Sequence, residues 1–178
     1  QNKEAIMHIS VIGASGSGKT FCMDKLCQAF KFESGKLPLF CSDLGLESEC
    51  AHKFDSDHVD EFMRAAFTME NAERWGIIDE VPTTTGRGNK AKPFLKIPRM
   101  GRHPGNLWVF GFQDFVGAEP IFRSQSTVWL IFRINLQEDA DKLYKQLGHP
   151  LIKDATLLET GNFIFFKDGQ AEVLRLAS

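Results

Sequence analysis

Eight consecutive residues carry the clearest chemistry in this sequence, because they match the spacing G-x-x-x-x-G-K-[ST]. They are Gly13, Ala14, Ser15, Gly16, Ser17, Gly18, Lys19 and Thr20. The glycines allow a tight turn in which backbone N–H groups approach phosphate oxygens. Lys19 would bring a positive charge to the β- and γ-phosphates, and the Thr20 hydroxyl would ligate Mg²⁺. The segment therefore predicts a P-loop that binds ATP or a related nucleoside triphosphate together with magnesium.

The apolar segment Trp75–Asp79 ends in a pair of acids, Asp79 and Glu80. Downstream of a P-loop, such a strand is typical of a Walker B element, in which Asp79 holds Mg²⁺ directly or through water. Glu80 would lie at the carboxyl edge of the sheet, where it can orient and deprotonate an attacking water. The pair of acids favours hydrolysis of the nucleotide over simple storage.

A further apolar run, Leu107–Phe112, is followed by Gln113. An amide at this place can contact both the γ-phosphate and the attacking water, which makes Gln113 a candidate sensor of the nucleotide state. Arg102 and His103 precede the run. They fit two interpretations, a role in the site or a solvated helix end, where the helix dipole favours cations.

The segment Thr83–Lys96 is polar at first and carries four cations, namely Arg87, Lys90, Lys92 and Lys96. Because it follows the predicted Walker B strand, a change of nucleotide state could move it. If it faced the pore of a ring, repeated copies would bind a DNA backbone without sequence preference and in a salt-sensitive way. An ordinary solvated loop is the competing interpretation.

Alternating strands and helices around these residues predict an α/β fold with a mostly parallel central sheet flanked by helices, closed by a C-terminal β-hairpin. We expect one P-loop NTPase domain over residues 1–178. Pro98 is expected to kink or break the helix that Pro93 begins. The predicted strands are Ile6–Ile12, Leu37–Cys41, Trp75–Asp79, Leu107–Phe112, Val128–Ile134, Phe163–Phe166 and Glu172–Leu176, and the predicted helices include Phe21–Phe30, His58–Met69 and Gln137–Leu147.

The composition sets limits on the possible functions. Of 178 residues, 43% are apolar and 25% charged, and the net charge of −2 gives no overall attraction to nucleic acid. No apolar run approaches the roughly 20 residues of a membrane span, so we expect no membrane span in this chain. The four cysteines show no metal-binding spacing and are expected to be free thiols.

The order P-loop, Asp79-Glu80, Arg102-His103 and Gln113 resembles the FtsK–HerA superfamily of DNA-pumping ATPases. Within it, the chain is similar to the genome-packaging ATPases of viruses with an internal membrane, over nearly the whole length from Ile6 to Leu176. Two places depart from the family pattern. Phe112 replaces the usual Thr or Ser before the sensor Gln, and Val81-Pro82 follows the acids where a small residue is common.

The resemblance implies a P-loop NTPase fold of the RecA/FtsK-like type. It further implies a homo-oligomeric ring of five or six subunits that passes double-stranded DNA through its centre and docks on a viral capsid vertex. It also implies an arginine that reaches from one subunit into the nucleotide site of the next. Arg123 is our candidate for this trans role and Arg102 for coupling, with Arg99 and Arg87 as alternatives. The expected location is the host cytoplasm and the virion.

Other functions remain open at this point. A filamentous-phage assembly ATPase of the Zot type shares the Arg-His and Gln features but carries a membrane span after its ATPase domain. A small nucleoside or nucleotide kinase fits the length and the P-loop, although it has no need of Glu80 and Gln113. A GTPase would require Asn-Lys-x-Asp, and the segment 89–92 lacks the final Asp. A non-enzymatic scaffold would not need Glu80.

Overall fold

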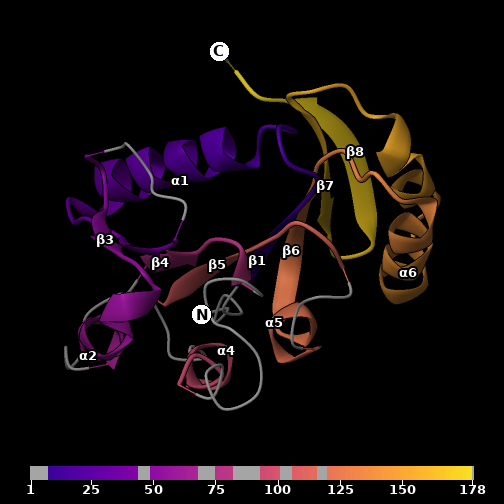
Figure 1. The fold of residues 1–178 in the computed structure, drawn as a ribbon. Coiled ribbons are helices and arrows are strands. Elements are labelled where there is room, and N and C mark those ends of the chain that lie inside the picture. The colour runs from indigo at the N-terminus through magenta and orange to yellow at the C-terminus, as the bar shows by residue number, and fades with distance from the viewer. Residues whose placement is uncertain are drawn as a thin grey trace, which may run out of the picture.

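The computed structural model describes residues 8–43, 49–67, 75–81, 93–100, 106–115 and 120–177. In the described chain, eight strands form one sheet in the order β3-β2-β4-β5-β1-β6-β7-β8 (Figure 1). The first six of these run parallel, and β7 and β8 follow as an antiparallel hairpin. The predicted mostly parallel sheet with a C-terminal hairpin is confirmed. The strands are β1 (His8–Ile12), β2 (Leu39–Cys41), β3 (His52–Phe54), β4 (Trp75–Ile78), β5 (Leu107–Phe112), β6 (Ser126–Ile131), β7 (Asn162–Lys167) and β8 (Gln170–Arg175).

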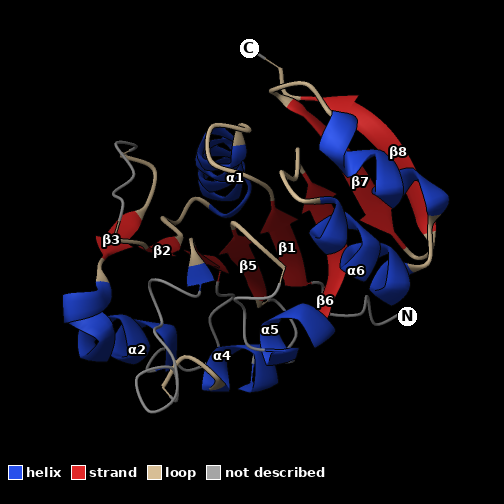
Figure 2. Ribbon diagram, turned by 45° about the vertical axis from the view of Figure 1, so that its right-hand side comes forward, coloured by secondary structure: helices blue, strands red, loops and turns tan. Residues whose placement is uncertain are grey.

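Helices cover both faces of the sheet. Figures 1 and 2 show α1 (Lys19–Ser34) on one side, and α2 (Val59–Phe67), α4 (Lys96–Met100) and α5 (Pro120–Ser124) on the other. The remaining helical segments are η1 (Ser56–His58), α6 (Gln137–Leu147) and η2 (Pro150–Leu157). Successive residues of each inner strand therefore enter different hydrophobic clusters. Val11 and Ile77 pack with α1, while Ile12 and Ile78 pack with the helices of the opposite face. Burial on both faces explains why these strands are continuous apolar runs rather than alternating patterns.

Predicted and observed elements agree closely where the sequence pattern is strong. The strand Leu107–Phe112 and the helix Gln137–Leu147 have the predicted bounds. The strand predicted to end at Ile134 ends at Ile131, because the backbone then turns to other partners. The Arg133 carbonyl accepts a hydrogen bond from Ala14 N at 2.8 Å, and Ile134 N donates to Ala155 O at 3.1 Å.

The expectation that Pro98 breaks a helix is wrong. The helix α4 begins at Lys96, so Pro98 lies in its first turn, where backbone N–H groups have no partner within the helix. The missing N–H of proline therefore costs nothing there. The predicted loop Thr83–Lys92 and the pair Arg102-His103 lie outside the described residues.

Candidate nucleotide site

The P-loop lies at the carboxyl edge of the sheet, between the end of β1 at Ile12 and the start of α1 at Lys19. Because β1 lies between β5 and β6, the loop is held from both sides. Gly13 N donates to Phe112 O at 3.2 Å, and Ala14 N donates to Arg133 O at 2.8 Å. A Cβ at position 13 would lie 2.6 Å from Phe132 Cβ, which only glycine avoids. The loop is therefore packed against its neighbours as closely as its backbone allows.

The C-terminal hairpin supports the loop from outside. Gly18, which precedes α1, has φ 110°, a conformation that glycine adopts far more easily than other residues. Gly161, just before β7, donates its N–H to Ser17 O at 3.1 Å and accepts from Leu176 N at 2.9 Å. The start of the hairpin is thus bonded to the P-loop, and its end lies close by, since a Cβ at position 18 would be 3.4 Å from Leu176 Cδ1.

Two side chains of the P-loop are prepared for an anion. Lys19 is buried, and its Nζ donates to Ala14 O at 3.0 Å. Burial lowers the pKa of the Lys19 ammonium, while the charges of Asp79 and Glu80 partly counteract this effect. The Ser17 hydroxyl is buried and makes no hydrogen bond within the described part of the chain. Phosphate oxygens would satisfy both groups.

The two acids after β4 differ in environment. Asp79 is only 3% exposed, and burial raises the pKa of its carboxyl above the ordinary value. Its Oδ1 accepts a hydrogen bond from Glu80 N at 2.8 Å. Glu80 has φ 47°, the left-handed region that residues with a side chain seldom occupy. Such backbone strain is common at functional sites.

Gln113 lies beside these acids, because β5 is the neighbour of β4 in the sheet. Its amide Nε2 donates to Glu80 Oε1. Gln113 and Glu80 are 33 residues apart in the sequence, so the fold alone brings them together. Lys19, Asp79, Glu80 and Gln113 are named here the P-loop network.

Sequence reasoning missed Gly111, on which this arrangement depends. A Cβ there would lie 2.5 Å from Asp79 Oδ1 and 2.5 Å from Met23 Cε. The signal for this role was present, since a glycine within an apolar strand often marks a close approach.

The residues predicted to hold magnesium fit the ion. Within the described residues, no group of three or more His, Cys, Asp or Glu side chains could form a metal site. Mg²⁺, however, needs only one or two protein oxygens beside phosphate and water. Asp79 supplies a buried carboxylate whose charge a cation would stabilise, and Thr20 supplies an exposed hydroxyl at the start of α1.

The two described candidate arginines lie on helices outside the P-loop. Arg123, on α5, is half-buried, and its guanidinium carbon lies 4.3 Å from the centre of the Phe115 ring of the same chain. Burial lowers the pKa of this guanidinium. Arg99 is exposed on α4, and Arg102 and Arg87 lie outside the described residues.

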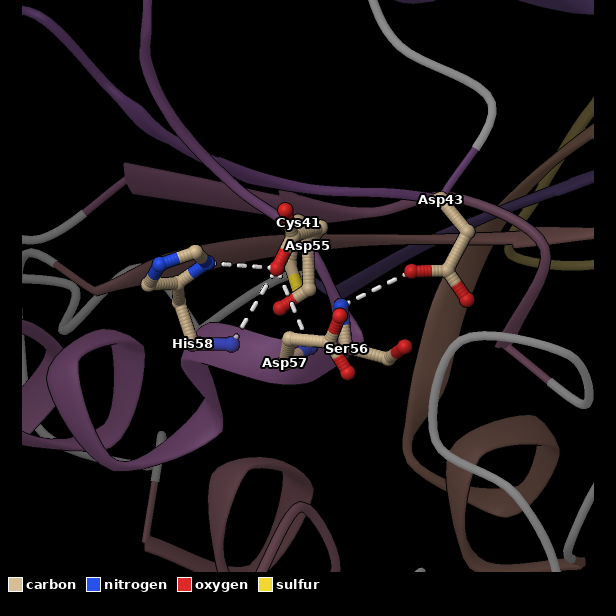
Figure 3. A network of polar contacts seen from close by, with 6 residues as sticks. All are labelled: Cys41, Asp43, Asp55, Ser56, Asp57 and His58. Atoms are coloured by element: carbon tan, nitrogen blue, oxygen red, sulfur yellow. Dashed lines mark hydrogen bonds and ion pairs between the residues drawn. The ribbon is translucent and has the colours of Figure 1, made fainter.

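A second set of polar residues follows β2 and β3 at the same edge of the sheet (Figure 3). Asp55 accepts from Asp57 N at 3.0 Å and from His58 N at 3.1 Å, and it contacts His58 Nδ1 at 2.6 Å. Asp43 Oδ1 accepts from Ser56 N at 2.7 Å. These five residues are named here the β2–β3 network.

Two surface hollows lie away from the P-loop. One, of about 450 Å³, borders the β2–β3 network. The other, of about 780 Å³, lies beside the turn between β7 and β8 and has no lining residue from the P-loop. Neither hollow contains a P-loop residue in its lining. We therefore place the candidate site at the P-loop itself and not in either hollow.

Comparison with models of protein families gives no match, and the curated proteins contain no significant relative. Solved structures match clearly. The genome packaging NTPase B204 from Sulfolobus turreted icosahedral virus 2, in complex with AMPPCP, has a TM-score of 0.77 at 15% identity, with 100% of both chains covered. The fold is that of a P-loop NTPase. Its similarity to viral packaging ATPases, predicted from the order of the motifs, is confirmed for the fold.

Two further structures have the same fold. EssC (ATPases 2 and 3) from Geobacillus thermodenitrificans has a TM-score of 0.68 at 11% identity, with 94% of this chain and 39% of EssC covered. The N-terminal domain of zonular occludens toxin from Neisseria meningitidis has a TM-score of 0.55 at 17% identity, covering 71% of this chain and 76% of that domain. None of the described helices is both long and apolar enough to cross a membrane.

Proposed function

We propose that this chain hydrolyses ATP and uses the energy to move double-stranded viral DNA into a preformed capsid, as a ring of five or six copies. The contact between the Gln113 amide and the Glu80 carboxylate, at the P-loop edge and next to Asp79, carries the proposal. It pairs a candidate base with a candidate sensor, which hydrolysis requires and simple nucleotide binding does not. The fold likeness to the B204 packaging NTPase over both full chains supports the packaging role.

In the proposed reaction, the P-loop N–H groups and Lys19 hold the β- and γ-phosphates of ATP. Thr20 and Asp79 would hold Mg²⁺, which, when bound, neutralises charge on the phosphate oxygens. Glu80 takes a proton from the attacking water as the water oxygen bonds to the γ-phosphorus and the bond to ADP breaks. Gln113 orients the Glu80 carboxylate before ATP arrives and can reach the γ-phosphate once it is bound.

The assembly belongs to the same proposal. From the family resemblance, Arg123 of a neighbouring subunit would complete each site, and Arg102 would couple the sites. The cations of Thr83–Lys96 would line the pore and bind the DNA backbone, which allows a chain of net charge −2 to handle DNA. The capsid vertex would be the docking partner, and the host cytoplasm and virion the places of action.

A filamentous-phage assembly ATPase is the second candidate, favoured by the fold likeness to the zonular occludens toxin domain. The match covers less of this chain than B204 does and has a lower TM-score. The packaging role therefore has the stronger support.

The test measures ATP hydrolysis by the purified chain, with and without double-stranded DNA, over a range of protein and salt concentrations. We expect stimulation by DNA that grows with protein concentration and falls with salt. Glu80→Gln is the control and should bind ATP normally while hydrolysis falls about 10²-fold. If turnover does not change with DNA but rises with an added nucleoside or nucleotide acceptor, the proposal is wrong and the chain is a kinase.

A further inference from the structure

Arg123 is a half-buried cation that faces an aromatic ring. Its guanidinium lies over Phe115, and its Nε is buried with no hydrogen-bond partner among the described residues. No carboxylate of the described chain lies within ion-pair distance of it. Burying part of a guanidinium costs free energy, and the cation–π contact with Phe115 offsets only some of that cost. An apolar side chain would fill this space without that cost, so packing alone does not explain the arginine.

The helix that carries Arg123 is firmly attached to the core. Phe122 is fully buried, and its ring packs edge-on against Phe110 of β5 at 5.0 Å. The Ser126 hydroxyl donates to Phe122 O at 3.1 Å and accepts from the Ser10 hydroxyl of β1 at 2.7 Å. Arg123 thus extends from a short helix tied to the two central strands that lead to the P-loop and to Gln113.

The ring under Arg123 belongs to the sensor segment. Phe115 is 6% exposed and lies two residues after Gln113, directly beyond the end of β5. Gln113 itself is exposed, and its amide contacts Glu80. A side chain at the solvent edge needs a fixed backbone to keep such a contact, and Phe115 is the next buried residue along the chain.

We propose that Arg123 is a positioning residue that acts within its own subunit: by holding Phe115, it fixes the backbone of residues 113–115 and thereby holds the Gln113 amide on Glu80. The proposal builds on the proposed function, because it explains how the sensor of that same site is set. It gives Arg123 a role different from the trans arginine implied by the family resemblance, and the two roles can be separated experimentally.

The first experiment compares Arg123→Met, Arg123→Lys and Phe115→Leu with the wild type. We expect the rate of ATP cleavage in a single turnover to fall about tenfold in Arg123→Met and Phe115→Leu. This loss is smaller than the roughly 10²-fold loss expected when a general base is removed. Affinity for a fluorescent ATP analogue should stay within about twofold, because the P-loop is intact. Arg123→Lys keeps a cation over the ring and should retain most of the rate.

Two controls separate positioning from general damage. Lys153→Met removes a second cation–π contact, in which Nζ lies 4.2 Å from the centre of the Tyr144 ring, far from Gln113 in the sequence and on other elements. It should leave the rate unchanged. In a Gln113→Ala background, Arg123→Met should cause no further loss, since the two residues act through one contact. A further tenfold loss in that background would overturn the proposal.

Mixing experiments distinguish the two roles of Arg123. If Arg123 acts in its own subunit, Arg123→Met will not be rescued by mixing with Lys19→Ala subunits, whose own P-loop cannot bind ATP. Rescue by the mixture would show that Arg123 serves the neighbouring site and would overturn the proposal.

A readout independent of turnover keeps this proposal distinct from the proposed function. The side-chain amide signals of Gln113 in an NMR spectrum, assigned from their loss in Gln113→Ala, should shift in Arg123→Met and remain in place in Lys153→Met. If wild-type chain hydrolyses no ATP but the signals shift, the proposed function fails and the positioning role stands. Unchanged Gln113 signals in Arg123→Met would overturn the positioning role, whatever the activity.

Discussion

The P-loop network and the β2–β3 network lie at the same edge of the sheet and both contain acidic residues beside a basic one. The surroundings stabilise the charged forms in one network and destabilise them in the other. In the β2–β3 network, the side-chain hydrogen bond from His58 lowers the pKa of Asp55, and the same bond raises the pKa of His58. The charged forms are thus stabilised by partners already present. In the P-loop network, burial raises the pKa of Asp79 and lowers that of Lys19, so both charged forms are destabilised.

The difference indicates which network is prepared for a ligand. Asp55 accepts from two backbone N–H groups at the start of η1 and so acts as a helix cap. That network is complete without any further group. For Asp79 and Lys19, burial outweighs the contacts within the chain, and a magnesium ion and a triphosphate would stabilise their charged forms. Acidic residues at a sheet edge are therefore uninformative until their burial and partners are known.

The largest effect should come from Lys19→Ala, which removes the buried cation of the P-loop network. We expect hydrolysis to fall about 10³-fold, with ATP binding weakened or lost, because no other described side chain brings a positive charge into the loop. The matched control is Lys53→Ala, at an exposed lysine beside the β2–β3 network, which should hydrolyse ATP normally. An active Lys19→Ala would rule out the P-loop assignment.

Gly111→Ala should have an intermediate effect on both stability and activity. The new Cβ would lie 2.5 Å from both Asp79 Oδ1 and Met23 Cε, so both side chains must move. We expect a loss of about 1–3 kcal/mol in the free energy of unfolding by urea, with reduced hydrolysis. Gly76→Ala is the control, because its Cβ would meet Trp108 and not Asp79. Equal loss of activity in both variants would mean that general destabilisation, not displacement of Asp79, is responsible.

Local patterns predicted the parts of the molecule that depend on neighbours in the sequence. The P-loop lies between a strand and a helix as predicted, and the segment Leu107–Phe112 forms a strand because its apolar run fits a sheet buried on both faces. The strand β3 was missed, because His52 and Lys53 are exposed and form no apolar run. The five-residue helix α5 is too short to show a helical period.

The contacts that complete the site depend on the fold and could not be predicted from the sequence. The closeness of Gly111 to Asp79 follows from the register between β4 and β5, and that of Arg123 to Phe115 from the packing of α5. Sequence reasoning identified Gln113 and Glu80 separately as sensor and base, but only the strand order β4-β5-β1 makes them direct partners.

The smallest effect should come from His58→Gln, which tests whether the β2–β3 network is only structural. The raised pKa of His58 gives a stabilisation that is complete below about pH 6.5 and is lost as the pH rises through the folded-state pKa. The lowered pKa of Asp55 gives a second stabilisation of the folded state, which is present above about pH 4 and is lost in stronger acid. Between these limits the wild type should melt slightly higher than the variant, and the difference should shrink as the pH rises through the folded-state pKa of His58.

Hydrolysis of ATP at pH 8 should be the same in His58→Gln as in the wild type, because the imidazole contacts Asp55 and no residue of the P-loop network. The pair is exposed, so solvent screens it and the shift in melting temperature will be small. A melting difference that does not shrink as the pH rises would mean that contacts independent of the charge of His58 stabilise the fold. Loss of hydrolysis in His58→Gln would instead mean that the two networks form one functional site. A residue that only caps a helix would not affect a reaction at neighbouring strands.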